Sequence, residues 1–142
     1  MNETIFADTF YWVALLNPRD NFHTQALSLT ATLSNTKIIT TDEILTEVLN
    51  FLSDAGQNLR QRGTNTIRQL LNTDPQKVTV LPQSHTTFLE GLELYEKRLD
   101  KGYSLTDCIS MVTMKQKRIN QILTNDHHFT QERFEILFTS NY

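Results

Sequence analysis

Apolar residues follow two alternating patterns along this chain. Short, nearly continuous apolar runs cover residues 4–8, 37–40, 77–81, 121–124 and 134–138, a length typical of strands. In the stretches between them, apolar residues recur three or four positions apart, which is typical of helices. These predicted helices cover residues 10–16, 23–33 and 44–52, a polar stretch through 67–71, and residues 88–99 and 104–118.

The helix predicted after the second strand has clear end signals. Thr40 and Glu43 have the spacing of a capping box, which predicts that the helix begins there. Gly56 is predicted to end it. Between these signals runs an apolar stripe at helical period, formed by Ile44, Leu45, Val48, Leu49 and Leu52.

Strands that alternate with helices predict βαβ units, and therefore an α/β fold with a mostly parallel sheet and right-handed crossovers. Ligands of such sheets lie beyond the carboxyl ends of the strands. Asp8 and Asp126 both follow the end of a predicted strand. The pattern therefore predicts that two carboxylates, from opposite ends of the sequence, reach the same edge of one sheet.

Length and composition indicate one globular domain over residues 1–142. The chain is 39% hydrophobic and 20% charged, and no stretch approaches the ~20 apolar residues of a membrane helix. The first residues lack the basic segment of a signal peptide, so we expect none. Cys108 is the single cysteine, which excludes an intramolecular disulfide and suits a reducing cytoplasm.

The formal net charge of −3 argues against a protein that coats nucleic acid nonspecifically, because such binding depends on Lys and Arg at phosphates. It does not exclude a nuclease, since an acidic metal site lowers the net charge while its cations offset it locally. Composition therefore leaves the function open.

Glu47 and Asp107 are the acids that could join Asp8 and Asp126. Glu47 lies at the border of the apolar stripe, and its position fits either an ordinary flanking glutamate or a carboxylate that faces the sheet. Asp107 is three residues after Ser104, which fits a helix cap. Its helix is apolar nearly all round, so a role in metal binding is equally compatible.

Convergence of four carboxylates would require a cation. Two carboxylates about 4 Å apart repel each other by roughly 4 kcal/mol at an effective dielectric constant near 20. Hard oxygen ligands in an open acidic pocket select Mg²⁺ or Mn²⁺. A metal held in this way can activate water for in-line attack on a phosphodiester, without a nucleophilic side chain.

Four segments together resemble the acidic motifs of the PIN-domain ribonucleases, and especially of the small VapC-type toxins of bacterial toxin–antitoxin pairs. The segments are "TIFADT" with Asp8, "TDEILTEVLN" with Glu47, "SLTDCIS" with Asp107 and "ILTNDHHF" with Asp126. The resemblance covers nearly the whole chain in order and spacing. It departs from the family at Phe10, where many members have a small polar residue, and in its weak basic character.

This resemblance implies a three-layer α/β/α sandwich with a mostly parallel central sheet of four to five strands. It implies a Mg²⁺- or Mn²⁺-dependent endoribonuclease that acts on RNA, forms a homodimer and is inhibited by a small cognate antitoxin. Asp8, Glu47, Asp107 and Asp126 would be the catalytic, metal-binding acids, and Thr124 a supporting polar residue.

Several other residues have chemistry that we interpret as structural. His127 and His128 could ligate a transition metal, but adjacent histidines on an extended segment point to opposite sides, so we favour a structural or solvated role. We expect the aromatic residues 10–12 and Cys108 in the core. Cations that could bind RNA are more simply explained as solvated helix faces, namely Lys97, Arg98, Lys101, Lys115, Lys117 and Arg118.

Two rival functions remain. A phosphotransfer domain with Asp8 as nucleophile would have a second acid just downstream, which "DTFYW" lacks. A catalytically silent PIN-fold module, acting through partner or RNA contact, would be indicated by loss of one or more acids. All four acids are present, so we rank the metal-dependent endoribonuclease first.

Overall fold

A parallel sheet lies at the centre of the computed structural model, which describes residues 3–139. Within these residues the sheet has the strand order β3-β2-β1-β4-β5, and every neighbouring pair is parallel. The prediction of a mostly parallel sheet is confirmed. The strands are β1 (Thr4–Ala7), β2 (Lys37–Thr41), β3 (Val78–Leu81), β4 (Gln121–Leu123) and β5 (Glu135–Ile136).

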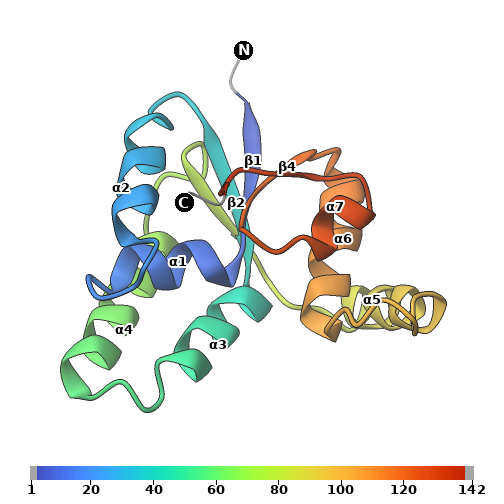
Figure 1. Ribbon diagram of the computed structural model, residues 1–142, viewed down its shortest axis with the longest axis horizontal. Helices are drawn as coiled ribbons and strands as arrows, with labels where there is room; N and C mark the ends of the chain where they lie inside the picture. The colour runs from blue at the N-terminus through green and yellow to red at the C-terminus, as the bar shows by residue number, and fades with distance from the viewer. Residues whose placement is uncertain (1–2, 140–142) are drawn as a thin grey trace.

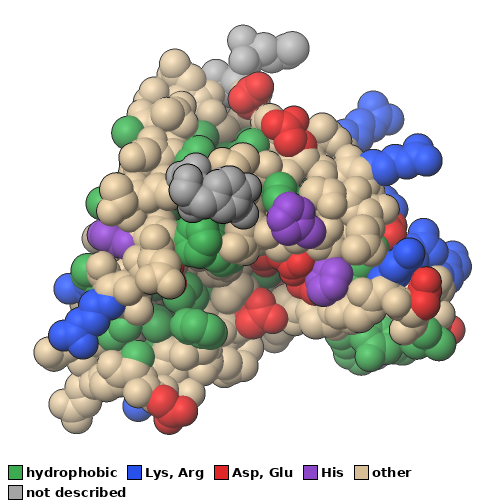
Figure 2. All heavy atoms as spheres, in the orientation of Figure 1, with side chains coloured by type: hydrophobic (Ala, Val, Ile, Leu, Met, Phe, Trp, Pro, Cys, Tyr) green, Lys and Arg blue, Asp and Glu red, His purple; other side chains and the backbone are tan. Residues whose placement is uncertain are grey.

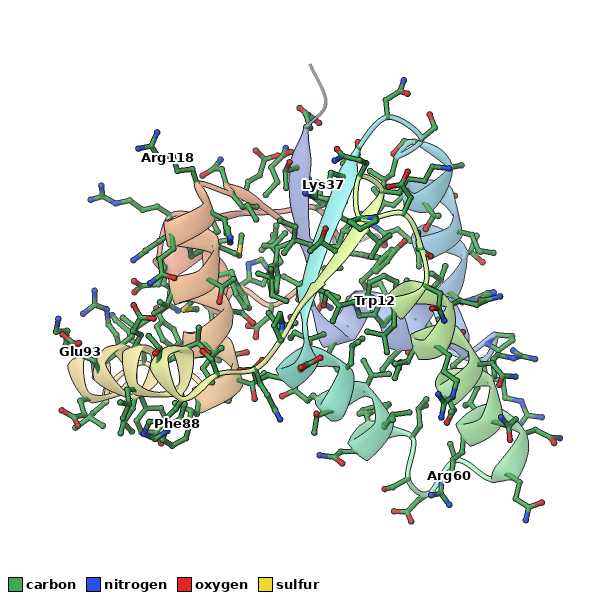
Figure 3. The ribbon with its side chains drawn as sticks, turned by 180° about the vertical axis from the view of Figure 1, so that it is seen from behind. Trp12, Lys37, Arg60, Phe88, Glu93 and Arg118 are labelled. Carbon is green, nitrogen blue, oxygen red and sulfur yellow. The ribbon has the colours of Figure 1, made fainter. Side chains whose placement is uncertain are left out.

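Helices cover both sides of the sheet and complete the three-layer sandwich (Figures 1 and 3). One side carries α1 (Thr9–Leu16), α2 (His23–Ala31), α3 (Asp42–Phe51) and α4 (Gln57–Leu71). The other carries α5 (His85–Lys97), α6 (Leu105–Lys117) and α7 (His128–Gln131). No helix among residues 3–139 is long and apolar enough to cross a membrane.

The central strand β1 is buried on both faces. Ile5, Phe6 and Ala7 are each at most 1% exposed, which explains why this strand is a continuous apolar run rather than an alternating one. Tyr11 and Trp12 on α1 are buried, as predicted for core aromatics, whereas Phe10 is only partly buried against the core. Cys108 is fully buried, and burial raises the pKa of its thiol to about 11.

The capping box predicted at Thr40 and Glu43 is wrong by one residue. Thr41 caps α3, because its hydroxyl accepts a hydrogen bond from Ile44 N–H at 3.1 Å. Thr40 still belongs to β2, and its hydroxyl donates to the carbonyl oxygen of Ala7 at 2.9 Å. Thr40 therefore ties β2 to the end of β1 and cannot cap the helix.

The chain after β4 also differs from the prediction. Strands over residues 121–124 and 134–138 were expected, and the structure has three residues in β4 and two in β5. Between them lies α7, a single helical turn that the apolar pattern did not predict, because its four residues contain one apolar side chain, Phe129. This turn changes where His127 and His128 point.

The close packing of α5 on α6 generates a stability prediction. A Cβ added at Gly91 would lie 2.5 Å from Ile109 Cγ1 and 3.2 Å from Ile109 N. We expect Gly91→Ala to lower the free energy of unfolding by about 1–3 kcal/mol, since overpacking outweighs the gain of about 1 kcal/mol in helix propensity. Urea denaturation measures this change.

Gly63→Ala is the matched control for Gly91→Ala. Gly63 also lies inside a helix, and its added Cβ would meet only the ends of two flexible side chains, Leu52 Cδ1 at 3.0 Å and Leu49 Cδ2 at 3.3 Å. We expect this variant to remain within about 1 kcal/mol of the parent. Equal stability of the two variants would contradict the packing that we describe at Gly91.

Candidate metal centre

The candidate site forms where the strand order changes direction. The chain runs outward from β1 through β2 to β3 on one side, and β4 pairs with β1 on the other side. Ligand sites of parallel sheets form at such switch points. The N–H of Asp8 donates to the carbonyl oxygen of Leu123 at 3.4 Å, so the residues that follow β1 and β4 are direct neighbours.

Asp8 is a buried carboxyl group at this point, with only 7% of its surface exposed. The pKa of Asp8 is raised to about 7, mainly by burial and also by the nearby charges of Asp107 and Glu47, while hydrogen bonds from Thr124 and the Thr9 N–H act in the opposite direction. An uncompensated negative charge is therefore unfavourable at Asp8.

Thr124 connects Asp8 with the acid that follows β4. It is fully buried, and its hydroxyl oxygen accepts a hydrogen bond from Asp126 N–H at 3.2 Å while its side chain hydrogen-bonds to Asp8. This is the supporting position that the sequence resemblance implies for Thr124.

Asp107 is a helix cap, which is one of the two interpretations that its sequence position left open, and it also lies beside the other acids. It caps α6 through a reciprocal pair of hydrogen bonds, in which Ser104 N–H donates to Asp107 Oδ2 at 3.1 Å and Asp107 N–H donates to Ser104 Oγ at 3.0 Å. Burial raises the pKa of Asp107, and the charges of Asp126 and Glu47 act in the same direction. The cap fixes the carboxylate at the site.

Glu47 reaches the cluster from α3. It is half-buried, and its Oε1 accepts a hydrogen bond from the Thr9 hydroxyl, which links the start of α1 to α3. Its charge acts on both Asp8 and Asp107. The sequence analysis missed Thr9, although its position directly after Asp8 could have drawn attention to it.

His128 is a further residue that the sequence analysis did not place at the site. One ligand atom each from Asp107, Asp126 and His128 lie within 4.8 Å of one another. The predicted extended segment at His127 and His128 is wrong, because His127 is the N-cap of α7 and His128 its first residue. The two rings are therefore not held on opposite sides of a strand.

The surface view shows the site from the same side as Figure 1. Acidic side chains lie in a hollow near the centre of this face, with histidine side chains beside them (Figure 2). Lys and Arg side chains gather at one edge of the same face. Among the acids of the site, Asp8 is buried, whereas Glu47, Asp107 and Asp126 are partly exposed.

The donor set fits a hard divalent cation. It consists of carboxylate oxygens, and burial together with neighbouring negative charge disfavours the ionised state of Asp8 and Asp107. A bound cation would offset this cost. Asp8, Glu47, Asp107 and Asp126 are the residues that could hold it. All four acids singled out in the sequence are in one neighbourhood, linked by Thr9 and Thr124.

A model of the PIN domain matches residues 5–134 of the chain. The chain belongs to the PIN domain family. This PIN domain has no match among curated proteins. The family assignment agrees with the resemblance drawn from the four acidic motifs.

Solved structures share the fold of this PIN domain over nearly its whole length. VapC20 from Mycobacterium tuberculosis, a sarcin–ricin loop cleaving toxin, has a TM-score of 0.80 and 24% identity, with 92% of this chain and 95% of that chain covered. FitAcB from Neisseria gonorrhoeae has a TM-score of 0.64 and 15% identity, over 94% and 96% of the two chains. VapBC2 from Rickettsia felis, bound to a promoter DNA fragment, has a TM-score of 0.62 and 14% identity, over 94% and 97%.

The raised pKa of Asp8 predicts how the stability of the metal-free protein depends on pH. The folded state holds a proton on Asp8 more tightly than the unfolded state, and this difference contributes to the free energy of unfolding. The contribution is fully present below about pH 4 and is lost as the pH rises through about 7. With about 1.4 kcal/mol for each pKa unit, the loss is on the order of 4 kcal/mol at most.

We therefore expect Asp8→Asn to be more stable than the parent at pH 8 with chelator present, and the difference to shrink toward pH 4. Urea unfolding at several pH values measures it. Asp54→Asn changes an exposed carboxylate between α3 and α4 and should leave the pH profile unaltered. Parallel profiles for Asp8→Asn and the parent would show that Asp8 ionises as freely in the folded state as in the unfolded state.

Proposed function

We propose that this PIN domain is a divalent-metal-dependent endoribonuclease that hydrolyses RNA phosphodiesters. The observation that carries the proposal is the gathering of Asp8, Glu47, Asp107 and Asp126 at the switch point of a PIN-family sheet. Mg²⁺ or Mn²⁺ is the ion that such oxygen ligands favour. No serine, cysteine or histidine nucleophile is needed for this chemistry.

The side chains at the site have two roles: the acids would hold the ion, and neighbouring hydroxyl residues would hold the acids. When bound, the divalent ion supplies positive charge at the scissile phosphate and an activated water. The four acids hold it, and each is kept in place by a neighbour: Thr124 contacts Asp8 and Asp126, Thr9 contacts Glu47, and Ser104 contacts Asp107. This support lowers the cost of ordering four charged side chains before the substrate arrives.

We further propose that the protein is the toxin of a type II toxin–antitoxin pair, acts in the cytoplasm and works as a homodimer. Supporting this, the structural neighbours include the toxin VapC20 and the VapBC and FitAB complexes, of which several are bound to DNA. A cognate small antitoxin would then be the protein partner, and RNA the substrate.

Cleavage assays with purified protein test the nuclease. We expect RNA cleavage with Mg²⁺ or Mn²⁺, its loss on chelation, and a decrease of about 100-fold or more for Asp107→Asn, since a metal ligand contributes several kcal/mol. Asparagine can still accept the Ser104 N–H bond, so the cap of α6 is kept while the charge is removed. Gel analysis of end-labelled RNA measures the rates.

A pair of glutamates on α3 provides the matched comparison. Glu47→Gln should decrease cleavage to a similar extent, whereas Glu43→Gln, one helical turn away, should leave it unchanged. Undiminished cleavage with chelator would exclude the metal mechanism. An intact protein that neither cleaves RNA nor binds a divalent ion would instead be the catalytically silent binding module.

The toxin role has a separate test. We expect induced expression to stop growth of a bacterial host, and co-expression of the small protein encoded beside the gene to restore it through a complex that copurifies. Growth arrest should be absent for Asp107→Asn. Growth arrest by this variant equal to that of the parent would show that toxicity does not come from the acidic site.

A further inference from the structure

The imidazole of His128 lies where a ligand of the proposed ion would lie. Its Nδ1 is 3.1 Å from Asp126 Oδ1, and both residues form a compact group with Asp107. Two neighbouring ligands of an octahedral ion with bonds of about 2.1 Å are separated by about 3 Å. The spacing of Nδ1 and Oδ1 is therefore that of two donors that share one cation.

Nδ1 of His128 also lacks a hydrogen-bond partner. The atom is buried although the side chain as a whole is 36% exposed, and its contact with Asp126 has the distance of an ion pair without the angle of a hydrogen bond. Asp126 Oδ1 instead accepts the backbone N–H of His128 at 2.9 Å. A buried nitrogen without a partner costs free energy unless a ligand satisfies it.

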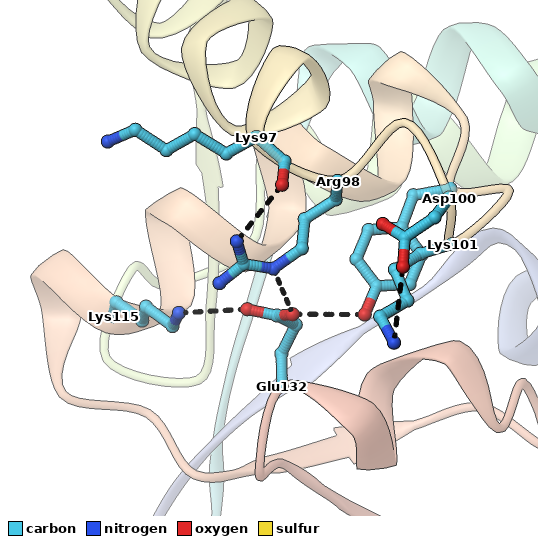
Figure 4. A network of polar contacts seen from close by, with 7 residues as sticks. Lys97, Arg98, Asp100, Lys101, Lys115 and Glu132 are labelled. Atoms are coloured by element: carbon cyan, nitrogen blue, oxygen red, sulfur yellow. Dashed lines mark hydrogen bonds and ion pairs between the residues drawn. The ribbon is translucent and has the colours of Figure 1, made fainter.

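Packing against Tyr103 holds the ring of His128 in this position. Tyr103 packs against it edge to face with ring centroids 5.4 Å apart, and the Tyr103 hydroxyl donates to Glu132 at 3.0 Å. Glu132, only 5% exposed, also accepts bonds from Arg98 at 2.9 Å and Lys115 at 3.2 Å (Figure 4). Arg98 and Lys115, which we interpreted from the sequence as solvated cations, therefore also pair with Glu132 while remaining partly exposed.

We propose that His128 is a nitrogen ligand of the divalent ion, and that it makes the site prefer Mn²⁺ over Mg²⁺. The inference rests on the proposed function, because it concerns the same acidic site. Mg²⁺ is a hard cation that takes oxygen ligands, whereas imidazole nitrogen is a ligand of first-row transition ions. Four carboxylates alone would not give this preference.

The position of α7 explains how the chain provides the nitrogen. The helical turn begins at His128 and brings this residue back toward the carboxylate of Asp126, two residues earlier. Glu132 follows α7 and anchors it to α5 and α6 through Arg98 and Lys115. The ion pairs around Glu132 therefore fix the ring without contacting the ion.

Electron paramagnetic resonance of bound Mn²⁺ tests the inference without reference to activity. We expect a directly bonded nitrogen coupling in the intact protein, and a changed coupling when its histidines are labelled with ¹⁵N. His128→Gln should lose the coupling and bind Mn²⁺ about tenfold more weakly by calorimetry, with a smaller change for Mg²⁺. His127→Gln, at an exposed neighbouring histidine, should match the parent in both measurements.

The outcomes separate the inference from the proposed function. Mn²⁺ bound with no histidine nitrogen coupling overturns the role of His128 and leaves the nuclease in place. An equal loss of Mn²⁺ and Mg²⁺ affinity in His128→Gln overturns the selectivity. An intact protein that binds Mg²⁺ but not Mn²⁺ overturns the role of His128 alone. Failure to bind either ion overturns both, and should then accompany a failure to cleave RNA. If His128→Gln does not fold, two other measurements test the role of His128. The nitrogen coupling should change on ¹⁵N-labelling of the histidines in the parent, and it should be retained in His127→Gln.

Discussion

Repulsion among carboxylates is the constraint on which this structure depends. Parallel strands send their carboxyl ends to one edge, and the switch between β1 and β4 places Asp8 beside the residues that follow β4. Glu47 and Asp107 add their charges to the same place, and burial further disfavours the ionised forms of Asp8 and Asp107. A fold that gathers negative charge in this way is stabilised by a cation and is less stable without one.

Small hydroxyl side chains make the arrangement possible. Thr9, Thr40 and Thr124 each bond across two elements: α1 to α3, β2 to β1, and the segment after β4 to the start of α1. The hydroxyls of Thr9 and Thr124 contact the acidic residues without adding charge, whereas Thr40 bonds to the backbone at the end of β1. Ser104 has the same function at the start of α6.

A second charged network, around Glu132, lies on the side of the sheet that carries α6 and α7. The side chain of Glu132 is only 5% exposed, and Arg98, Tyr103 and Lys115 each donate to it (Figure 4). These bonds hold the pKa of Glu132 below its usual range, although burial opposes this. The fold thus contains a buried carboxylate satisfied by the protein and, at the switch point of the sheet, a cluster of acids in which the pKa values of Asp8 and Asp107 are raised.

The sequence by itself determined the alternation of strands and helices and the parallel sheet, which follow from local periodicity, and it placed Asp8 and Asp126 at one edge of that sheet. Glu47, Asp107 and Thr124 were selected by the resemblance of the motifs. Tertiary structure alone decided that Thr9 bonds to Glu47, that Thr41 rather than Thr40 caps α3, and that His128 turns toward Asp126. Each of these depends on contacts between elements distant in sequence, or on a four-residue helix too short to leave a periodic pattern.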